Sequence, residues 1–236
     1  MTDWRGLEDR MSLRARLSRR PVAVTFLGSA PVGVPKFTGS EPSGCSFWRL
    51  AAEGRTFYTV PSDHFNCAVG SYTHGIDLSP ERASETAQTL ELMVRVHYIR
   101  PEEVAGIPRL SEAPAAVVYS PLAETPVPPG VVLFACRPRS AMLLQEAVNR
   151  AGKAGTLPTL GRPTCMALPA ALAHGTVTSL GCIGNRIYTG LTDDDLYVAI
   201  PGADLAAVAD ALDIIASANA ELSTYAEGRY AQLSTA

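Results

Sequence analysis

Apolar residues recur at helical intervals in four long stretches of the chain. The clearest stretch follows Ser79-Pro80, which suits a helix start because serine caps exposed amides and proline fits the first turn. Each stretch carries an apolar stripe that predicts a helix with one buried face. These helices are expected at residues 3–18, 79–100, 141–151 and 205–222. The chain turns polar after the last of them, so we expect residues 223–236 to fray or to meet a partner.

Short runs rich in β-branched and aromatic residues alternate with these helices. Such runs are typical of buried strands, because branched side chains pack well on a pleated surface. The expected strands are residues 22–27, 55–60, 115–119, 131–136, 176–180 and 196–200. Two short helices are expected as well, one at 46–53 and one beginning at Cys165, with a loop beginning at Cys182. The pattern predicts the α+β class: a mixed sheet with flanking helices in a single compact domain of residues 1–236.

A cysteine, a short apolar run and a glycine follow one another twice along the chain. Cys45 opens one such segment, and Cys165 opens a similar one. Each segment is followed by a second cysteine, Cys67 or Cys182, and then by a Tyr-Thr pair. This order predicts an internal duplication, although the second half carries an extra helix and the first cysteine pair is more widely spaced. The predicted half-repeats are residues 19–105 and 113–222.

The composition limits the classes of function that the chain can serve. Hydrophobic residues make up 47% of 236 residues, which is enough for a substantial core. A net charge of -3 leaves no basic surface of the kind that nucleic acid requires. The sequence shows no apolar run that suits a secretion signal or a membrane span, so we expect a cytoplasmic protein with neither nucleic acid nor membrane as a partner. In that reducing compartment, the five cysteines are expected to be thiols or metal ligands rather than disulfides.

Several motifs of the chain resemble those of one family. They are residues 21–24, 63–70, 161–165, 180–190 and 196–201. On these motifs the chain is similar, over nearly its whole length, to the uncharacterised domain-of-unknown-function family 169 of archaea and anaerobic bacteria. The resemblance implies a shared fold and no established activity. It emphasises four cysteine positions and leaves Cys136 outside the set; the four are Cys45, Cys67, Cys165 and Cys182.

Four cysteines that meet in space would form a ligand set for a metal. Thiolates hold both iron–sulfur clusters and structural zinc, and the neighbouring glycines would let backbone amides approach a cluster. The spacing differs from the close Cys-x-x-Cys pairs of zinc ribbons and ferredoxins, so a site forms only if the two halves fold together. We expect an iron–sulfur cluster of the [4Fe-4S] type, with zinc as the alternative metal. The expected cofactor and metal ligands are Cys45, Cys67, Cys165 and Cys182.

Two interpretations without a metal stay open. Free cysteine is among the most buried residue types, so the four could be separate packing residues of a structural subunit. Alternatively, Cys182 or Cys67 could be the nucleophile of a small-molecule-binding thiol enzyme, which leaves enzymatic activity uncertain. The candidates for the base, the anion holder and the pocket lining are then His64, His74, Arg186 and Tyr188, with the loop 181–190.

Other charged and ring side chains support weaker hypotheses. Arg49 and Arg162 lie within four residues of a cysteine and could balance the charge of a cluster or bind an anionic substrate. For His64 and His74 a solvated loop position is the simplest expectation. His97 is expected in the core of its helix face.

The leading hypothesis is an iron–sulfur-cluster-binding redox or accessory protein of anaerobic metabolism, with the cluster at the junction of the two halves. Its partner would be a redox protein or a small molecule. Assembly of several copies into a homo-oligomer is a further possibility. Whether the four cysteines meet is a geometric question that the order of residues leaves open.

Overall fold

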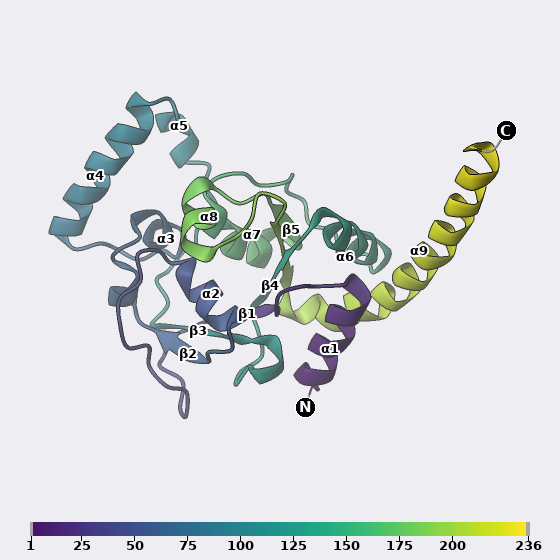
Figure 1. The fold of residues 1–236 in the computed structure, drawn as a ribbon. Coiled ribbons are helices and arrows are strands. Elements are labelled where there is room, and N and C mark those ends of the chain that lie inside the picture. The colour runs from purple at the N-terminus through teal and green to yellow at the C-terminus, as the bar shows by residue number, and fades with distance from the viewer. Residues whose placement is uncertain (1, 235–236) are drawn as a thin grey trace.

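Six short strands form one sheet at the centre of the molecule, and the computed structural model describes residues 2–234 (Figure 1). The strands are β1 (Val22–Leu27), β2 (Phe57–Thr59), β3 (Ala116–Pro121), β4 (Val131–Cys136), β5 (Val177–Ser179) and β6 (Leu196–Pro201). Their spatial order is β2-β3-β1-β4-β6-β5, and every pairing between these strands is antiparallel. The fold is therefore α+β, but the predicted mixed sheet is wrong. Helices cover both faces, and β4 and β6 are apolar along almost their whole length, a pattern that is typical of parallel strands.

The strand pairings repeat on either side of the central β1–β4 pair. On one side β1 runs against β3, with Val22 opposite Pro121, and β2 adds to the outer edge of β3. On the other side β4 runs against β6, with Val131 opposite Pro201, and β5 adds to the outer edge of β6. Followed outward from the centre, the strand order is β1-β3-β2 on one side and β4-β6-β5 on the other. The first, second and third strands of the two series therefore occupy corresponding places.

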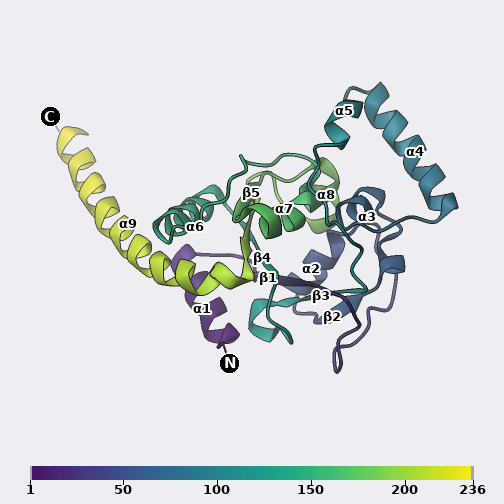
Figure 2. The same cartoon turned by 180° about the vertical axis from the view of Figure 1, so that it is seen from behind.

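Helices form a layer on each face of the sheet (Figures 1 and 2). The helices are α1 (Trp4–Ala15), α2 (Ser46–Ala52), α3 (Ala68–Thr73), α4 (Pro80–Arg95), α5 (Pro101–Val104), α6 (Pro138–Arg150), α7 (Ala167–His174), α8 (Ile183–Thr189) and α9 (Leu205–Ser234). On one face α1, α6 and α9 pack around Met11, Leu144 and Leu212. On the other face α2 and α7 contribute Phe47 and Leu168 to a second core. The sheet thus separates two apolar layers that have different neighbours.

Two helices extend beyond the packed layers, as both views show (Figures 1 and 2). No residue of α4 is buried, although its spacing predicted a buried face. Helical periodicity identifies an apolar stripe but does not provide an element to cover it. In α9 the last buried residue is Leu212, yet the helix continues to Ser234. The predicted fraying of 223–236 is therefore wrong for residues 223–234, which include the strong helix formers Ala, Glu, Gln and Leu.

Most predicted elements are confirmed, including the six strands and the four long helices, although the last helix runs twelve residues beyond its predicted end at 222. Two short helices, α3 and α8, lie where no helix was predicted, and α8 occupies the loop that was predicted to begin at Cys182. Each has only six or seven residues and contains glycine, which predicted a turn instead. Within the described part of the chain, no helix combines the length and the apolar character that crossing a bilayer requires.

Candidate functional site

Four of the five cysteines lie where short helices begin on one side of the sheet. Cys45 is the residue before α2, Cys67 is the residue before α3, and Cys182 is the residue before α8. Cys165 lies in the helical turn Thr164–Met166 that leads into α7. Cys136 instead packs in the core on the opposite face of the sheet. The set of four that the sequence singled out is thus also separated from Cys136 by the fold.

Helices of the two chain halves pack against each other at the site. α2 contacts α8, which brings the segments of Cys45 and Cys182 together. α3 contacts the Thr164–Met166 turn, which does the same for Cys67 and Cys165. Each of these contacts joins one cysteine from the N-terminal half to one from the C-terminal half.

The four thiols are close enough for their charges to affect one another. Burial raises the pKa of the Cys165 thiol well above its ordinary value, and the neighbouring thiolates of Cys67, Cys45 and Cys182 raise it further. Burial also raises the pKa of Cys45 to about 11, and Cys67 and Cys182 add to that increase. The structure therefore brings all four predicted ligand positions into one electrostatic neighbourhood, and all five cysteines are free thiols.

The thiols do not form a ready ligand set for a single ion. Among residues 2–234, no group of three or more His, Cys, Asp and Glu side chains has the arrangement that holds one metal ion. Zinc would require every sulfur to lie about 2.3 Å from one point.

A serine and two glycines bring the segments of Cys45 and Cys67 close together. Ser43 Oγ lies 2.8 Å from Cys45 Sγ, and the Cys67 thiol donates to the same oxygen at 3.9 Å. The Gly70 amide donates to Cys67 Sγ at 3.3 Å. A Cβ on Gly70 would lie 2.9 Å from that sulfur and 3.8 Å from the Cα of Gly44. Glycine at position 70 is therefore required for the observed position of the Cys67 thiol.

A threonine and a tyrosine contact the segment of Cys182. The Cys182 amide donates to Thr164 Oγ1 at 2.6 Å, which ties the start of α8 to the turn that contains Cys165. Burial raises the pKa of the Tyr98 hydroxyl, and the Cys182 thiolate raises it further, so this ring lies beside the site. Arg162 stacks on the Tyr98 ring at 5.0 Å and pairs with Glu103 at 3.2 Å. The Arg162 guanidinium thus connects this edge of the site to α5.

His64 and His74 are buried, and the prediction of solvated loop positions is wrong for both. Their rings stack edge to face at 5.2 Å within an aromatic cluster that includes Phe47 and Tyr119. His64 Nε2 bonds to Thr59 Oγ1 at 2.8 Å. Burial lowers the pKa of His64 well below its ordinary value and that of His74 to about 4. Both rings are therefore neutral near pH 7, and the apolar surroundings that cause this come from strands distant in sequence.

His97 departs from its predicted place in a core. It lies past the end of α4, has a left-handed φ of 57° and is exposed. No residue of the helix whose face it was expected to join is buried, so the ring has no core to enter.

Several buried polar atoms around the cysteines have no hydrogen-bond partner. The Tyr119 hydroxyl is one of them; burial raises its pKa, and the thiolates of Cys45, Cys67 and Cys165 add to the increase. Others belong to the histidine pair and to the segments that follow Cys45 and Cys182. Among the described residues this group comprises Ser46 Oγ, Trp48 Nε1, His64 Nδ1, both ring nitrogens of His74, Tyr119 Oη, and both amide atoms of Asn185. Unsatisfied polar groups are uncommon in a folded interior, and their concentration here is consistent with a site for a polar or charged group.

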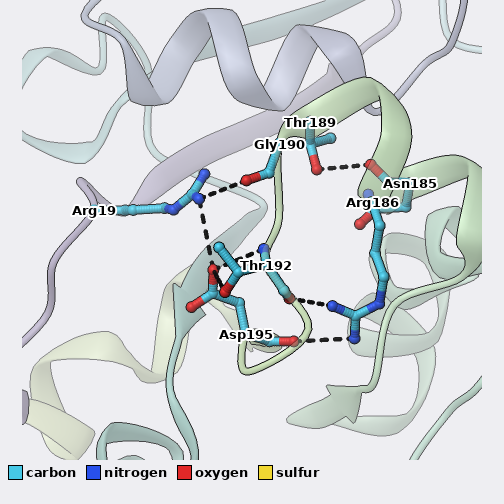
Figure 3. Close-up of polar contacts among 7 residues, drawn as sticks. All are labelled: Arg19, Asn185, Arg186, Thr189, Gly190, Thr192 and Asp195. Atoms are coloured by element: carbon cyan, nitrogen blue, oxygen red, sulfur yellow. Dashed lines mark hydrogen bonds and ion pairs between the residues drawn. The ribbon is translucent and has the colours of Figure 1, made fainter.

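Arg186 makes its observed contacts with backbone carbonyls (Figure 3). Its guanidinium donates to the carbonyls of Leu180 and Asp195, at 2.6 and 3.2 Å, and to the carbonyl of Thr192. Arg19 supports the other side of the same loop through the Gly190 carbonyl at 2.8 Å and the Asp195 carboxylate at 3.5 Å (Figure 3). These contacts fix the path of residues 181–195, which positions α8 and Cys182.

The remaining predicted side chains lie at the margins of the site. Arg49 pairs with Glu53 at 3.0 Å and with Glu41 at 3.7 Å on the outer side of α2. Tyr188 is exposed on α8.

Sequence reasoning missed the side chains that support the cysteines, namely Ser43, Thr164, Tyr119 and Asn185. For Asn185 a signal was present, because position 185 lies one helical turn after Cys182. That signal is visible only when residues 183–189 are recognised as a helix, and glycine at position 184 argued against one.

Comparison with known proteins gives a family match. The family model described as "Uncharacterised ArCR" (DUF169) matches residues 10–211. The chain is also 27% identical over 183 residues to the "Uncharacterized protein MJ0308" of Methanocaldococcus jannaschii, covering 73% of this chain and 77% of that protein. No solved structure matches the sequence.

Proposed function

Because the chain belongs to the domain-of-unknown-function family 169, whose printed descriptions name no reaction, we propose its function from the geometry of the four-cysteine site. We propose that the protein binds a [4Fe-4S]-type iron–sulfur cluster through thiolates of both chain halves, and that it serves as a redox or accessory protein. The proposed ligands are Cys45, Cys67, Cys165 and Cys182.

The observation that carries this proposal is the packing of α2 on α8 and of α3 on the Thr164–Met166 turn, which brings the segments of four cysteines from distant parts of the chain to one side of the sheet. Burial and the neighbouring sulfurs raise the pKa of Cys45 and Cys165, so both are neutral thiols near pH 7 unless a positive centre stabilises their ionised forms. Iron supplies that positive charge and displaces the thiol protons on binding. A cluster places its thiolates on separate irons, so they need not meet at one point as zinc requires.

The polar atoms without partners also suit a cluster. Ser46 follows Cys45, and Asn185 lies one turn after Cys182, so both side chains are near proposed ligands. Cluster sulfides and thiolates accept hydrogen bonds from nearby donors, and such donors are a recognised means of tuning a cluster. The amide of Gly70 already donates to the sulfur of Cys67.

The proposal includes an internal duplication of the chain. In support, exchanging β1, β2 and β3 for β4, β5 and β6 leaves the order of strands in the sheet unchanged. In the central pair, Ala23 lies opposite Val132, and each is the second residue of its strand. The amide after β3 bonds to the carbonyl before β1, and the amide after β6 bonds to the carbonyl before β4, at 2.9 Å in both cases. These pairings favour placing the boundary between the halves after β3. Duplication would explain why each half contributes two cysteines before helices.

We also propose a cytoplasmic location, because a reducing compartment keeps such thiols available to iron. The thiol-enzyme alternative has less support from the geometry. Both candidate bases are buried, and the Arg186 guanidinium makes three contacts with loop carbonyls. The thiol-enzyme alternative nevertheless states what to expect if the protein binds no metal.

Anaerobic purification tests the proposal directly. Iron, acid-labile sulfide and zinc are measured per chain, together with the visible absorption spectrum, for the parent protein and for single Cys→Ser variants. We expect about four irons and four sulfides per chain in the parent, as the [4Fe-4S] composition requires. Substitution of any of the four ligands should sharply reduce both. Cys136→Ser is the matched control, because this cysteine packs on the other face of the sheet and should leave the loading unchanged.

Each other outcome identifies an alternative. A folded parent with stoichiometric zinc and no sulfide would replace the cluster by a zinc site. A folded, metal-free and colourless parent would refute the proposal; rapid alkylation of Cys182 alone would then favour the thiol enzyme, whereas four unreactive thiols would indicate packing residues.

A further inference from the structure

The outer part of α9 forms a helical arm, residues 221–234, that leaves the body of the protein. Shortly before the arm, Asn219 Nδ2 still donates to the Glu146 carboxylate of α6 at 2.9 Å. Every residue from 224 to 234 is exposed, and both views show this end pointing away from the sheet and its helices (Figures 1 and 2). The family match ends at residue 211, so the arm lies outside the matched part of the chain.

One side of the arm carries apolar side chains at helical spacing. Leu222, Tyr225, Ala226 and Leu233 occupy positions i, i+3, i+4 and i+11, and Arg229 lies among them at i+7. Leu222, Tyr225 and Leu233 are 64%, 71% and 61% exposed. Most of the stability of a helix in a protein comes from packing of such a face, and a contiguous exposed one indicates an interaction surface.

The charges on this side of the arm fit a second copy of the same helix. Glu221, Tyr225 and Arg229 are four residues apart, so they lie along one ridge with the tyrosine midway between opposite charges. Eight residues of helix span about 12 Å, so Glu221 and Arg229 do not pair within one arm. In an antiparallel pair with its two-fold axis at Tyr225, Arg229 of each copy lies beside Glu221 of the other. A parallel pair would instead place like charges together.

The shape and the area of the arm also suit this pairing. A surface hollow lined by Thr224, Tyr225, Gly228 and Arg229 lies beside the ridge, where it can receive the tyrosine ring of a second copy. The exposed tyrosine and leucines of two copies would together bury about 600 Å². The stems of the paired charges bring the total close to the value of about 1,000 Å² that a specific interface needs. An interface of this size is typical of a dimer that dissociates readily.

We propose that two copies of this chain form a dimer through the arms of α9. The arms pack antiparallel with Tyr225 at the two-fold axis, and Arg229 of each copy pairs with Glu221 of the other. α9 belongs to the helix layer opposite the four cysteines, so the dimer does not depend on whether those cysteines bind a metal.

Sedimentation equilibrium of the full chain tests the dimer from about 1 to 200 μM, a range that spans micromolar dissociation constants. The parent should show a monomer–dimer equilibrium. Glu221→Arg and Arg229→Glu each bring like charges together at two places, so each should raise the dissociation constant at least about tenfold. The double variant restores two pairs of opposite charges and should dimerise within about threefold of the parent.

Glu227→Arg is the matched control for Glu221→Arg. It makes the same change of charge on the same helix, but residues two positions apart point about 200° apart, so Glu227 faces away from Arg229. Its dissociation constant should equal that of the parent. Replacing both Leu222 and Leu233 by serine should leave the chain monomeric over the range, and circular dichroism should show a folded protein because both side chains are exposed.

Two results would overturn the inference. A parent that stays monomeric over the whole range would show that the arm does not pair with a second copy. A dimer that Glu221→Arg and Glu227→Arg weaken equally, or that the double charge variant does not restore, would show that association uses another surface.

Discussion

Replacing His74 by leucine should remove a large part of the acid sensitivity of the fold. The His74 ring is buried against Phe26 at 5.1 Å and His64 at 5.2 Å, and neither ring nitrogen has a partner in the described chain. Burial lowers the pKa of the ring from 6.5 to about 4. Between those two values the unfolded chain binds a proton at this position and the folded chain does not.

The magnitude follows from that interval. The stabilisation is fully present above pH 6.5 and is lost progressively as the pH falls toward 4, because the unfolded state binds more protons there. At about 1.4 kcal/mol for each pH unit, the loss due to His74 alone is about 3 kcal/mol. At pH 7.5 the His74→Leu variant should unfold within about 1 kcal/mol of the parent, because the substitution removes unpartnered polar atoms together with one ring contact.

Urea unfolding followed by circular dichroism, from pH 7.5 down to pH 4.5 with matched iron content, measures this difference. The parent should lose substantially more free energy of unfolding across the range than His74→Leu does. His174→Gln controls for the loss of a histidine, because position 174 is exposed at the end of α7. If the parent and His74→Leu lose stability in parallel, burial of the neutral ring is not a source of the acid sensitivity.

Two further substitutions test the site and the opposite helix layer. Gly70→Ala places a Cβ 2.9 Å from Cys67 Sγ, so anaerobic iron loading should fall at least by about half, while the gain in helix propensity offsets part of the crowding cost. Gly184→Ala is the control, because the atom nearest to its new Cβ is a Tyr188 ring carbon at 3.8 Å. Equal iron loading of the two variants would contradict the proposal that the Cys67 thiol is a ligand. Glu8→Gln disrupts a buried carboxylate that bonds to Arg20 at 2.9 Å and to a backbone amide at 2.6 Å. The substitution should lower the free energy of unfolding in urea by about 2 kcal/mol. This is less than the loss expected for a fully buried ion pair, because the Arg20 side chain is one-third exposed. An unchanged urea midpoint would show that the Glu8–Arg20 pair does not stabilise the fold.

Local pattern was a good guide to the elements of this fold. The strand at 22–27 and the helix at 3–18 were predicted because branched apolar runs and helical spacing are properties of neighbouring residues. The same reasoning failed for the helix at 183–189. It is too short to show periodicity, and its stability depends on packing against α2.

The direction of strand pairing and the burial of the two histidines could not be predicted from neighbouring residues, for a different reason. β4 and β6 are apolar on both faces because two helix layers cover the sheet, so their composition did not reveal antiparallel pairing. His64 and His74 occur in a polar segment after β2, which predicted solvent exposure. They are buried because aromatic residues from β1, α2 and β3 close around them.

From the sequence alone it followed where the strands and the long helices begin, which stripe of each long helix is apolar, and which four cysteines belong to the family motifs. Tertiary structure alone decided that α2 meets α8 and that α3 meets the turn of Cys165. Periodicity reports on residues a few positions apart. Contacts between the halves depend instead on the order β2-β3-β1-β4-β6-β5, which joins β1 to β4 at the centre and so brings distant cysteines to the same face of one sheet.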